Sequence, residues 1–222
     1  MKKIIKYIGG KTVRPLTAKY LSVTRKYTYN EIQLIIPPEV FHPGFFFSSK
    51  LLLKYILTLQ LNERKFLELG AGSGLIAFSA AKKGASVTAT DINPIAIEYL
   101  KKNSRLNNLP VQIILSDLFQ NIPMQAFDII AINPPYYKKE PVTDAEFAWY
   151  CGTNGEYFST LFKGLKNYID AQSLVFMVLS EESDLQMIKG IASGCSFILE
   201  PLQTKKLMWE TNFIFKIKHN EI

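Results

Sequence analysis

Lys65-Phe-Leu-Glu-Leu-Gly-Ala-Gly-Ser-Gly74 contains the clearest indication of the fold. Residues 65–69 predict a short buried strand, and three alternate glycines then break it, because glycine adopts backbone conformations that other residues avoid. A helix is expected to follow as far as about Lys83. A strand, a glycine-rich turn and a helix in this order are typical of a nucleotide-binding unit.

The same alternation extends over the rest of the chain. Further strands are predicted at residues 32–36, 86–90, 111–115, 127–132 and 173–179, and further helices at 50–59, 94–107 and near 157–168. Ser48 or Ser49 is expected to cap the first of these helices, and Asn93 the second. The segments 197–207 and 212–218 resemble an antiparallel pair. The pattern predicts an α/β fold with a mostly parallel sheet, helices on both faces and an antiparallel C-terminal edge.

Composition limits the classes of protein that the chain can represent. Its 222 residues predict one domain with a short appendage. The apolar run 173–179 is far shorter than the roughly 20 residues of a membrane span, and the N-terminus has no apolar signal-peptide core. The two cysteines, Cys151 and Cys195, follow no metal or redox spacing. A cytoplasmic protein without membrane contact and without metal catalysis is therefore expected.

The positive charge is concentrated at the N-terminus. Residues 1–30 contain eight Lys or Arg and no acid, which gives +8, whereas the other 192 residues have 18 basic and 19 acidic side chains and sum to −1. We expect residues 1–40 to form a basic arm with one or two small elements, and residues 41–222 to form the main domain. The arm, which also contains tyrosines, could bind the phosphates of RNA or DNA. The alternative is a solvated positive face that only aids solubility.

Acidic residues accompany three consecutive predicted strands at the edge of the sheet that binds ligands in such folds. Glu68 precedes the glycines and could accept hydrogen bonds from a ligand's ammonium group or its water shell. Asp91 could accept both hydroxyls of a ribose. Asp117 could accept from the amino group of an adenine, with Ile92 and Leu118 flanking the ring. Each acid alone could instead be a helix cap or a surface residue.

Two common nucleotide sites are excluded by the glycine-rich turn. The dinucleotide fingerprint requires a glycine at position 75, where this chain has Leu75. A phosphate-binding P-loop requires a Lys followed by Ser or Thr, and neither follows the turn. The remaining expectation is a cofactor without a pyrophosphate group.

Asn133-Pro-Pro-Tyr136 follows the apolar strand 127–132 directly. Asn133 should therefore lie at the carboxyl end of that strand, and the two prolines fix the backbone beyond it. A side-chain amide held in this way can accept hydrogen bonds from a planar amino group. The alternative is a strand that ends in an ordinary Pro-rich turn.

These motifs, with Asp91-Ile-Asn-Pro94 and Ser116-Asp-Leu-Phe119, resemble the class I S-adenosylmethionine-dependent methyltransferases of the "small domain" group. That group includes release-factor glutamine methyltransferases and enzymes that methylate amino groups of RNA bases. The resemblance covers about residues 38–182. It implies a seven-stranded Rossmann-like sheet and S-adenosyl-L-methionine as the cofactor. It also implies roles at the cofactor for a set of residues: the glycine loop (Gly70, Gly72, Gly74) at the methionine part, Asp91 at the ribose and Asp117 near the adenine.

The resemblance also places the acceptor nitrogen at the Asn-Pro-Pro-Tyr motif. We expect Asn133 Oδ1 and the Pro134 carbonyl to accept the two N–H bonds of the acceptor nitrogen, and Tyr136 to stack on its planar group. Pro135 and Tyr137 are the other expected substrate contacts. The segment 41–49 resembles the part that covers the cofactor pocket in this group. Residues 137–157 could form a substrate-facing loop or a packed lid.

Three functions remain open at the level of the sequence. The first is N-methylation of a base in RNA or DNA, supported by the basic arm. The second is N-methylation of a glutamine side chain in a protein, supported by the resemblance. The third is a cofactor-binding or assembly module without catalysis, and the intact Asn133 motif counts against it. The partner is accordingly RNA, DNA or a protein that carries the target nitrogen, and the oligomeric state is not readable from the sequence.

Overall fold

The predicted alternation of strands and helices is present in the computed structural model, which describes residues 20–45, 47–207 and 210–220. Its elements are β1 (Arg25–Tyr29), β2 (Ile32–Ile36), α2 (Phe47–Ile56), β3 (Lys65–Leu69), α3 (Leu75–Lys82), β4 (Ser86–Asp91), α4 (Pro94–Asn107), β5 (Gln112–Leu115), β6 (Ile129–Ile132), α5 (Glu156–Leu165), the 3-10 helix η2 (Lys166–Tyr168), β7 (Leu174–Ser180), α6 (Leu185–Ser193), β8 (Phe197–Leu207) and β9 (Glu210–His219).

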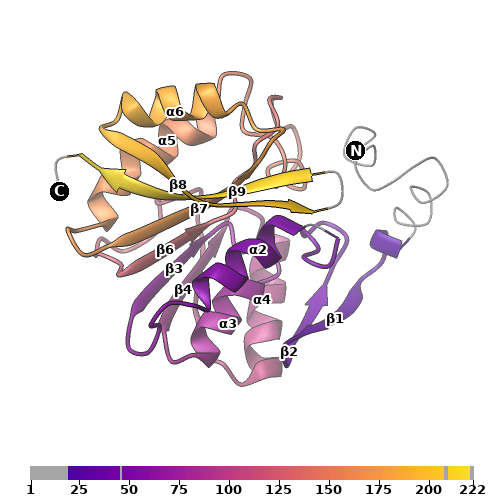
Figure 1. Cartoon of the computed structure of the whole chain (residues 1–222). Coiled ribbons are helices and arrows are strands. Elements are labelled where there is room, and N and C mark those ends of the chain that lie inside the picture. The colour runs from indigo at the N-terminus through magenta and orange to yellow at the C-terminus, as the bar shows by residue number, and fades with distance from the viewer. Residues whose placement is uncertain (1–19, 46, 208–209, 221–222) are drawn as a thin grey trace.

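Seven of the strands form one twisted sheet in the order β5-β4-β3-β6-β7-β9-β8 (Figure 1). The five strands from β5 to β7 are parallel, whereas β9 is antiparallel to both of its neighbours, β7 and β8. The predicted fold class, with its antiparallel C-terminal edge, is therefore confirmed. In this order β3 and β6 lie side by side at the centre, so the segments that follow them meet at the middle of one sheet edge.

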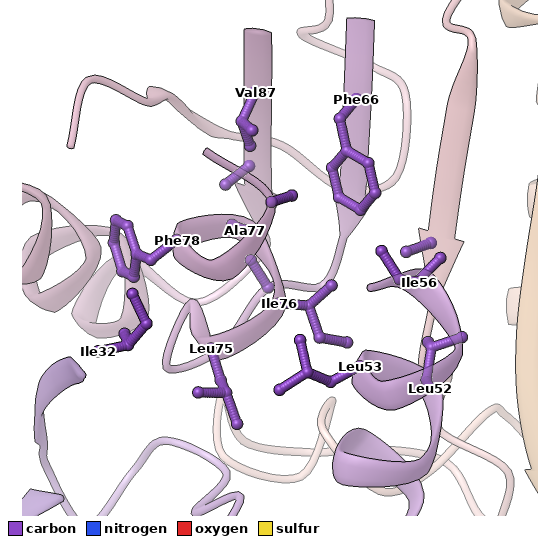
Figure 2. Packing of buried hydrophobic residues seen from close by; sticks show 14 of the residues in the cluster. Ile32, Leu52, Leu53, Ile56, Phe66, Leu75, Ile76, Ala77, Phe78 and Val87 are labelled. Carbon is purple, nitrogen blue, oxygen red and sulfur yellow. The ribbon is translucent and has the colours of Figure 1, made fainter. Parts of the chain in front are cut away.

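Helices cover both faces of the sheet (Figure 1). One face carries α2, α3 and α4, and its core includes Phe66 of β3 and Phe176 of β7. Leu53 of α2 and Ile76 of α3 point toward one another in this layer (Figure 2). The other face carries α5 and α6 around a second apolar core, which includes Phe162. Burial on both faces explains why β6 is wholly apolar and β7 contains a single polar residue, Ser180.

The strands β1 and β2 form a separate hairpin that docks on α4 through two asparagines. The Asn107 side chain accepts from the backbone N–H of Gln33 at 2.8 Å and donates to the Gln33 carbonyl at 2.7 Å. Asn103 repeats this pattern with the N–H and carbonyl of Ile35, at 2.8 and 3.2 Å. The two amides, four residues apart on one helix face, thus pair with the β2 backbone as a neighbouring strand would.

The predicted helix 50–59 is shifted in the structure, where α2 begins at Phe47 and ends at Ile56. Ser48 and Ser49 lie inside its first turn with buried side chains, so the expectation that one of them caps the helix was wrong. In contrast, the predicted cap of α4 is confirmed, because the Asn93 side chain accepts from Ile95 N–H at 2.9 Å.

Two elements were not predicted from the sequence. The strand β1 lies in the segment that was interpreted as a basic arm, and its residues alternate between half-buried and exposed. The helix α6 fills the connection before β8; Asp184 caps it, and Ile188 and Ala192 pack into the core. Of the basic and aromatic residues expected to act in the arm, Arg25, Lys26, Tyr20, Tyr27 and Tyr29 are described, whereas the others lie outside the described residues: Lys2, Lys3, Lys6, Tyr7, Lys11, Arg14 and Lys19.

Candidate active site

A cavity of about 290 Å³ opens at the carboxyl ends of the central parallel strands. Twelve of the thirteen residues that the sequence singled out line this cavity: Glu68, Gly70, Gly72, Asp91, Ile92, Asp117, Leu118, Asn133, Pro134, Pro135, Tyr136 and Tyr137. Gly74 is the exception. A Cβ atom at that position would lie 2.6 Å from Leu100 Cδ2, so Gly74 lets the start of α3 pack closely on α4.

The glycine loop is shaped by backbone conformations that favour glycine. Gly70, Gly72 and Gly74 have φ angles of 68°, 52° and 83°, all in the left-handed region. A Cβ atom on Gly70 would have no neighbour within 4 Å, and one on Gly72 would lie 3.8 Å from Val40. Since both glycines line the cavity, their missing side chains leave room for a ligand to approach the loop.

Asp91 connects the end of β4 to this loop. Its Oδ2 accepts from Gly72 N–H at 2.8 Å and its Oδ1 from Asn93 N–H at 2.9 Å. Burial raises the pKa of the carboxyl, while these backbone hydrogen bonds act in the opposite direction. Each oxygen still has a lone pair, so the group can hold the loop and accept from a ligand at the same time.

Glu68 lies at the inner end of the cavity and is only 5% exposed. Its Oε2 accepts from Ala77 N–H, in the first turn of α3, at 2.7 Å. Burial raises the pKa of this carboxyl to about 8, against the effect of the hydrogen bond and with a smaller contribution from the negative charge of Asp91. Glu68 is therefore mostly neutral at pH 7 in the protein alone, and a bound cation would favour its ionised form.

The turn after β5 places Asp117 and Leu118 at the cavity. Leu118 has a φ of 45°, which is unusual for a residue other than glycine. Ser116 stabilises the turn, because its hydroxyl donates to the Leu118 carbonyl at 2.9 Å and accepts from Asn121 N–H at 3.0 Å. Leu118 is consequently buried against the cavity, while Asp117 is exposed.

Asn133 follows β6 directly, and its amide has a defined orientation. Its Nδ2 donates to the hydroxyl of Ser49 at 2.9 Å. With the nitrogen end bound to α2, Oδ1 is the end of the amide that remains for a ligand in the cavity. Pro134, which fixes the next part of the backbone, is buried.

The hydroxyl of Tyr136 is hydrogen-bonded, so the position of the ring is fixed. Its hydroxyl is hydrogen-bonded by Ser180, at the end of β7, and by Tyr137. Burial raises the pKa of this hydroxyl to about 12, so the side chain is neutral. Its ring centroid lies 4.9 Å from that of Tyr137 at a tilted angle. The two rings thus form one aromatic wall of the cavity.

Residues 137–152 form a paired segment beside the cavity. Tyr137 N–H donates to the Trp149 carbonyl and Cys151 N–H to the Tyr137 carbonyl, both at 3.0 Å. The Trp149 ring lies 5.3 Å from that of Phe41, which belongs to the segment before α2, and both residues line the cavity. The segment is therefore packed and still faces the site.

Three residues of the site, Phe41, Ser49 and Tyr157, were expected only as parts of the segments 41–49 and 137–157 and were given no role of their own at the cavity. Ser49 was interpreted as a helix cap. Phe41 was recognised only as part of a covering segment. Tyr157, in the first turn of α5, lines the cavity, and burial together with the negative charges of Asp117 and Asp91 raises the pKa of its hydroxyl. The available sequence signal for Ser49 was a pair of serines before an apolar helix, and such a pair can also indicate a helix cap.

The charges on the cavity wall have a single sign. Seven carboxyl side chains line it, and among the described lining residues there is no Lys, Arg or His: Glu39, Glu68, Asp91, Asp117, Glu140, Asp144 and Glu156. The two lysines of the adjoining segment pair with acids, Lys138 with Asp184 at 2.9 Å and Lys139 with Glu146 at 2.8 Å. The wall therefore favours neutral or positively charged ligands.

These features fit S-adenosylmethionine. Buried carboxyl groups can accept from its ammonium group and ribose hydroxyls, the glycine loop leaves space along the backbone, and Ile92 and Leu118 offer apolar surface for the adenine. No group of three or more His, Cys, Asp and Glu side chains within the described residues could hold a metal ion. In the same part of the chain, no helix combines the length and apolar character needed to cross a membrane.

Comparison with known sequences supports this fit. Residues 31–149 match the family model "Methyltransferase small domain". The chain is 36% identical over 158 residues to a Methanocaldococcus jannaschii protein that carries the provisional name protein N5-glutamine methyltransferase, an alignment that covers 67% of this chain and 76% of that protein. It is 46% identical over 153 residues to a bifunctional methyltransferase of Rickettsia felis, which covers 67% of this chain but only 25% of the relative.

Known structures share the fold. A methyltransferase from Pyrococcus furiosus superimposes with a TM-score of 0.61 and 22% identity over 84% of this chain and 89% of its own. The 16S rRNA N2 G1207 methyltransferase of T. thermophilus, solved with S-adenosylmethionine and guanosine, gives a TM-score of 0.61 and 20% identity over 87% of this chain and 50% of its own. The chain therefore belongs to the methyltransferase small domain family, and it is an S-adenosylmethionine-dependent methyltransferase, as its sequence predicts.

Proposed function

We propose that this enzyme methylates the side-chain amide nitrogen of a glutamine in a protein. The observation that carries the proposal is the orientation of Asn133, whose Nδ2 is bound by Ser49 so that Oδ1 remains for a ligand. An oxygen acceptor at this point suits a group that offers N–H bonds. The planar –NH₂ of an amide or an aromatic amine is such a group.

The residues of the motif then orient the acceptor nitrogen. Bound S-adenosylmethionine would supply an electrophilic methyl group, whose bond to sulfur breaks as the bond to nitrogen forms, so that S-adenosylhomocysteine is the leaving group and the methylated nitrogen then releases one proton to water. The lone pair of an amide nitrogen is delocalised, and the nitrogen is a weak nucleophile. Asn133 Oδ1 and the Pro134 carbonyl accept its two N–H bonds, which directs the lone pair and stabilises the positive charge that develops on nitrogen. Holding the nitrogen in this geometry can contribute most of the rate enhancement.

We assign the remaining predicted residues to two groups. Glu68, the glycine loop, Asp91, Ile92, Asp117 and Leu118 hold the cofactor, with Gly74 acting through the packing of α3 rather than at the cavity. Pro135, Tyr136 and Tyr137 contact the substrate. The position of nearly all these residues on one cavity wall supports the assignment.

The charge of the cavity wall favours a protein acceptor over a nucleic acid. A nucleotide that enters the site brings at least one phosphate close to the carboxylates of the wall, which include Asp117, Glu140 and Asp144, and the described wall has no cation to receive it. A glutamine in a peptide is neutral. The provisional name of the Methanocaldococcus relative agrees with this choice, and the alignment covers 76% of that protein.

Methylation of a base in RNA or DNA is the second candidate. It is favoured by the cations near the hairpin, where Arg25 stacks over Tyr20 at 4.1 Å and Lys50 lies 5.7 Å from the rings of Tyr27 and Tyr29. Such a surface could hold phosphates outside the cavity while one base enters it.

Labelled cofactor separates the two candidates. The enzyme is incubated with S-adenosylmethionine labelled in the methyl group and with separate protein, RNA and DNA fractions. We expect label in the protein fraction, and acid hydrolysis should release methylamine from N5-methylglutamine. Label that enters RNA and is released by nuclease would establish the second candidate instead. Label in no fraction would favour a binding module without catalysis.

Asn133→Ala tests the observation on which the proposal depends. The variant should bind S-adenosylmethionine with nearly normal affinity, while its turnover falls by about a hundredfold or more, as expected when a group that orients the reaction is lost. Turnover equal to that of the wild type would remove Asn133 from the mechanism.

Two further assignments belong to this proposal. We propose that the enzyme works in the cytoplasm, which its two free cysteines, Cys151 and Cys195, support. We also propose a division of the chain into an N-terminal part, residues 1–40, and a catalytic domain, residues 41–222. Among the described residues, the β1–β2 hairpin pairs with no strand of the seven-stranded sheet, which supports that boundary, while Ile32, Leu34 and Ile36 of β2 pack into the same core as α3 and α4.

A further inference from the structure

Ser49 connects the helical layer to the motif at the end of β6. It lies in the first turn of α2, is 8% exposed and lines the cavity. Its hydroxyl accepts the hydrogen bond from Asn133 Nδ2 at 2.9 Å, although the two residues are 84 positions apart in the chain. This contact connects α2, which covers one face of the sheet, to Asn133, the residue proposed to bind the acceptor nitrogen.

The contact determines what Asn133 can present to the cavity. The terminal torsion of an asparagine side chain has broad, roughly two-fold preferences, so the adjoining prolines fix the backbone but not the amide. If the amide were reversed, its NH₂ group would meet the N–H bonds of the acceptor, and two donors would face each other. Only the orientation with Oδ1 toward the cavity is productive.

In the productive orientation, Nδ2 points into the protein and needs an acceptor. A part-buried donor without a partner is unfavourable. The Ser49 hydroxyl is the acceptor at this place. By accepting from Nδ2, the Ser49 hydroxyl favours the orientation in which Oδ1 faces the cavity.

We propose that Ser49 is a positioning residue for methyl transfer, because it accepts the hydrogen bond from Asn133 Nδ2 and thereby directs Oδ1 to the acceptor nitrogen. The inference rests on the proposed role of Asn133. Ser49 itself touches neither reacting atom, so its effect must pass through Asn133.

The test compares Ser49→Thr with Ser49→Val. The two variants have nearly the same shape and add the same methyl group, so any disturbance of packing is common to both, and only threonine keeps the hydroxyl. Turnover is measured with labelled S-adenosylmethionine and with the protein, RNA or DNA fraction that takes up label. Binding of S-adenosylmethionine is measured separately by titration calorimetry, and thermal unfolding is recorded for each variant.

We expect the valine variant to have a kcat about ten- to a hundredfold lower than the threonine variant, the effect of losing one oriented hydrogen bond. The affinity for S-adenosylmethionine should be alike in the two, and the unfolding temperature of the valine variant should be lower only by the effect of leaving Asn133 Nδ2 without its acceptor. Ser79→Ala is the control, because Ser79 is a buried serine of α3 whose hydroxyl donates to the Leu75 carbonyl within the helix. It should keep the turnover of the wild type.

Equal kcat values for the threonine and valine variants would overturn the inference, even if Asn133→Ala were inactive. Ser49→Val is also made in the Asn133→Ala background, where it should cause no further loss of turnover. The same loss in both backgrounds would show that Ser49 acts independently of Asn133, and would likewise overturn it. If Asn133→Ala alone had normal turnover, the proposed function of the motif would fail first, and the role of Ser49 with it.

Discussion

At the scale of single residues, Glu68 is the group whose environment differs most from water. Its carboxyl is buried at the cavity beside Ala77 N–H, and the pKa is raised from 4.5 to about 8. The native state therefore holds this proton more tightly than the unfolded chain does. The contribution to stability is complete below about pH 4.5 and is lost as the pH rises through 8.

Glu68→Gln should remove this dependence, because glutamine keeps an oxygen for the Ala77 N–H but has no proton to lose. Between pH 5.5 and 8, the wild type should lose on the order of a few kcal/mol of unfolding free energy relative to the variant. Urea denaturation of both proteins at the two pH values measures the difference. Parallel loss of stability in the two proteins would mean that Glu68 is ionised throughout.

Asp91→Asn is the second substitution at this scale. The carboxylate accepts from Gly72 and Asn93 with different oxygens, and an amide can replace only one of them as an acceptor. We expect the affinity for S-adenosylmethionine to fall at least about tenfold, through the loss of the loop contact and of the acceptor for the ribose. Calorimetric titration with the cofactor measures the effect. An unchanged affinity would show that Asp91 serves only the local turn.

At the scale of elements, the glycines of the loop have two different roles, which are to leave space in the cavity and to allow close packing of α3. Gly70 and Gly74 both have positive φ, so alanine at either position costs roughly 1 to 2 kcal/mol of backbone strain. The Cβ of Gly70→Ala would meet open space in the cavity, whereas that of Gly74→Ala would meet Phe78 and Leu100. Gly74→Ala should therefore lower the unfolding temperature more, and Gly70→Ala should weaken S-adenosylmethionine binding more than its small loss of stability explains. Thermal unfolding and cofactor titration of the two variants, compared side by side, would contradict this assignment if the order were reversed.

The docking of the hairpin on α4 gives a prediction for a whole element. Asn103→Ala leaves the part-buried N–H and carbonyl of Ile35 without these partners, which should lower the unfolding free energy by about 1 kcal/mol. Hydrogen exchange should show faster exchange at Ile35 N–H than at the amides of β3. Arg105→Ala, on the exposed side of the same helix, is the control. Uniform exchange across the molecule would mean that Asn103 is not specific to the hairpin.

The elements that the sequence predicted well are those with local signals. Asn93 and Pro94 define the start of α4. Both ends of that helix, Pro94 and Asn107, were predicted correctly. The residues that follow β3, β4, β5 and β6 converge on the cavity because parallel strands end at one edge, which makes their position predictable from strand order alone. The strand β1 was missed because its Lys and Arg residues resemble a solvated arm, and its pairing with β2 becomes visible only in three dimensions. Ser49 was misassigned for the same reason, since its partner Asn133 is 84 residues away.

At the scale of the whole molecule, the net charge of the chain and the charge of the cavity wall have opposite signs. The chain has a net charge of +7, yet the described cavity wall contains seven carboxyl groups and no Lys, Arg or His. A polyanion would be attracted by the net positive charge of the chain but repelled at the site. A segment with positive side chains beside the methylated residue would be attracted to the mouth of the cavity.

The charge of the acceptor should therefore control its KM. Two peptides with the same central glutamine are compared, one flanked by lysines and one by glutamates, with a serine-flanked peptide as the neutral control. We expect the lysine-flanked peptide to have the lowest KM and the glutamate-flanked peptide the highest, with similar kcat, because the flanking charges act on binding rather than on the reacting nitrogen. The difference should shrink between 50 and 500 mM salt, since mobile ions screen charges near the mouth of the cavity. If the glutamate-flanked peptide bound best, the acceptor would have to be held by cations outside the cavity, such as Arg25 and Lys50, rather than by the acidic wall, and this result would favour the nucleic acid candidate.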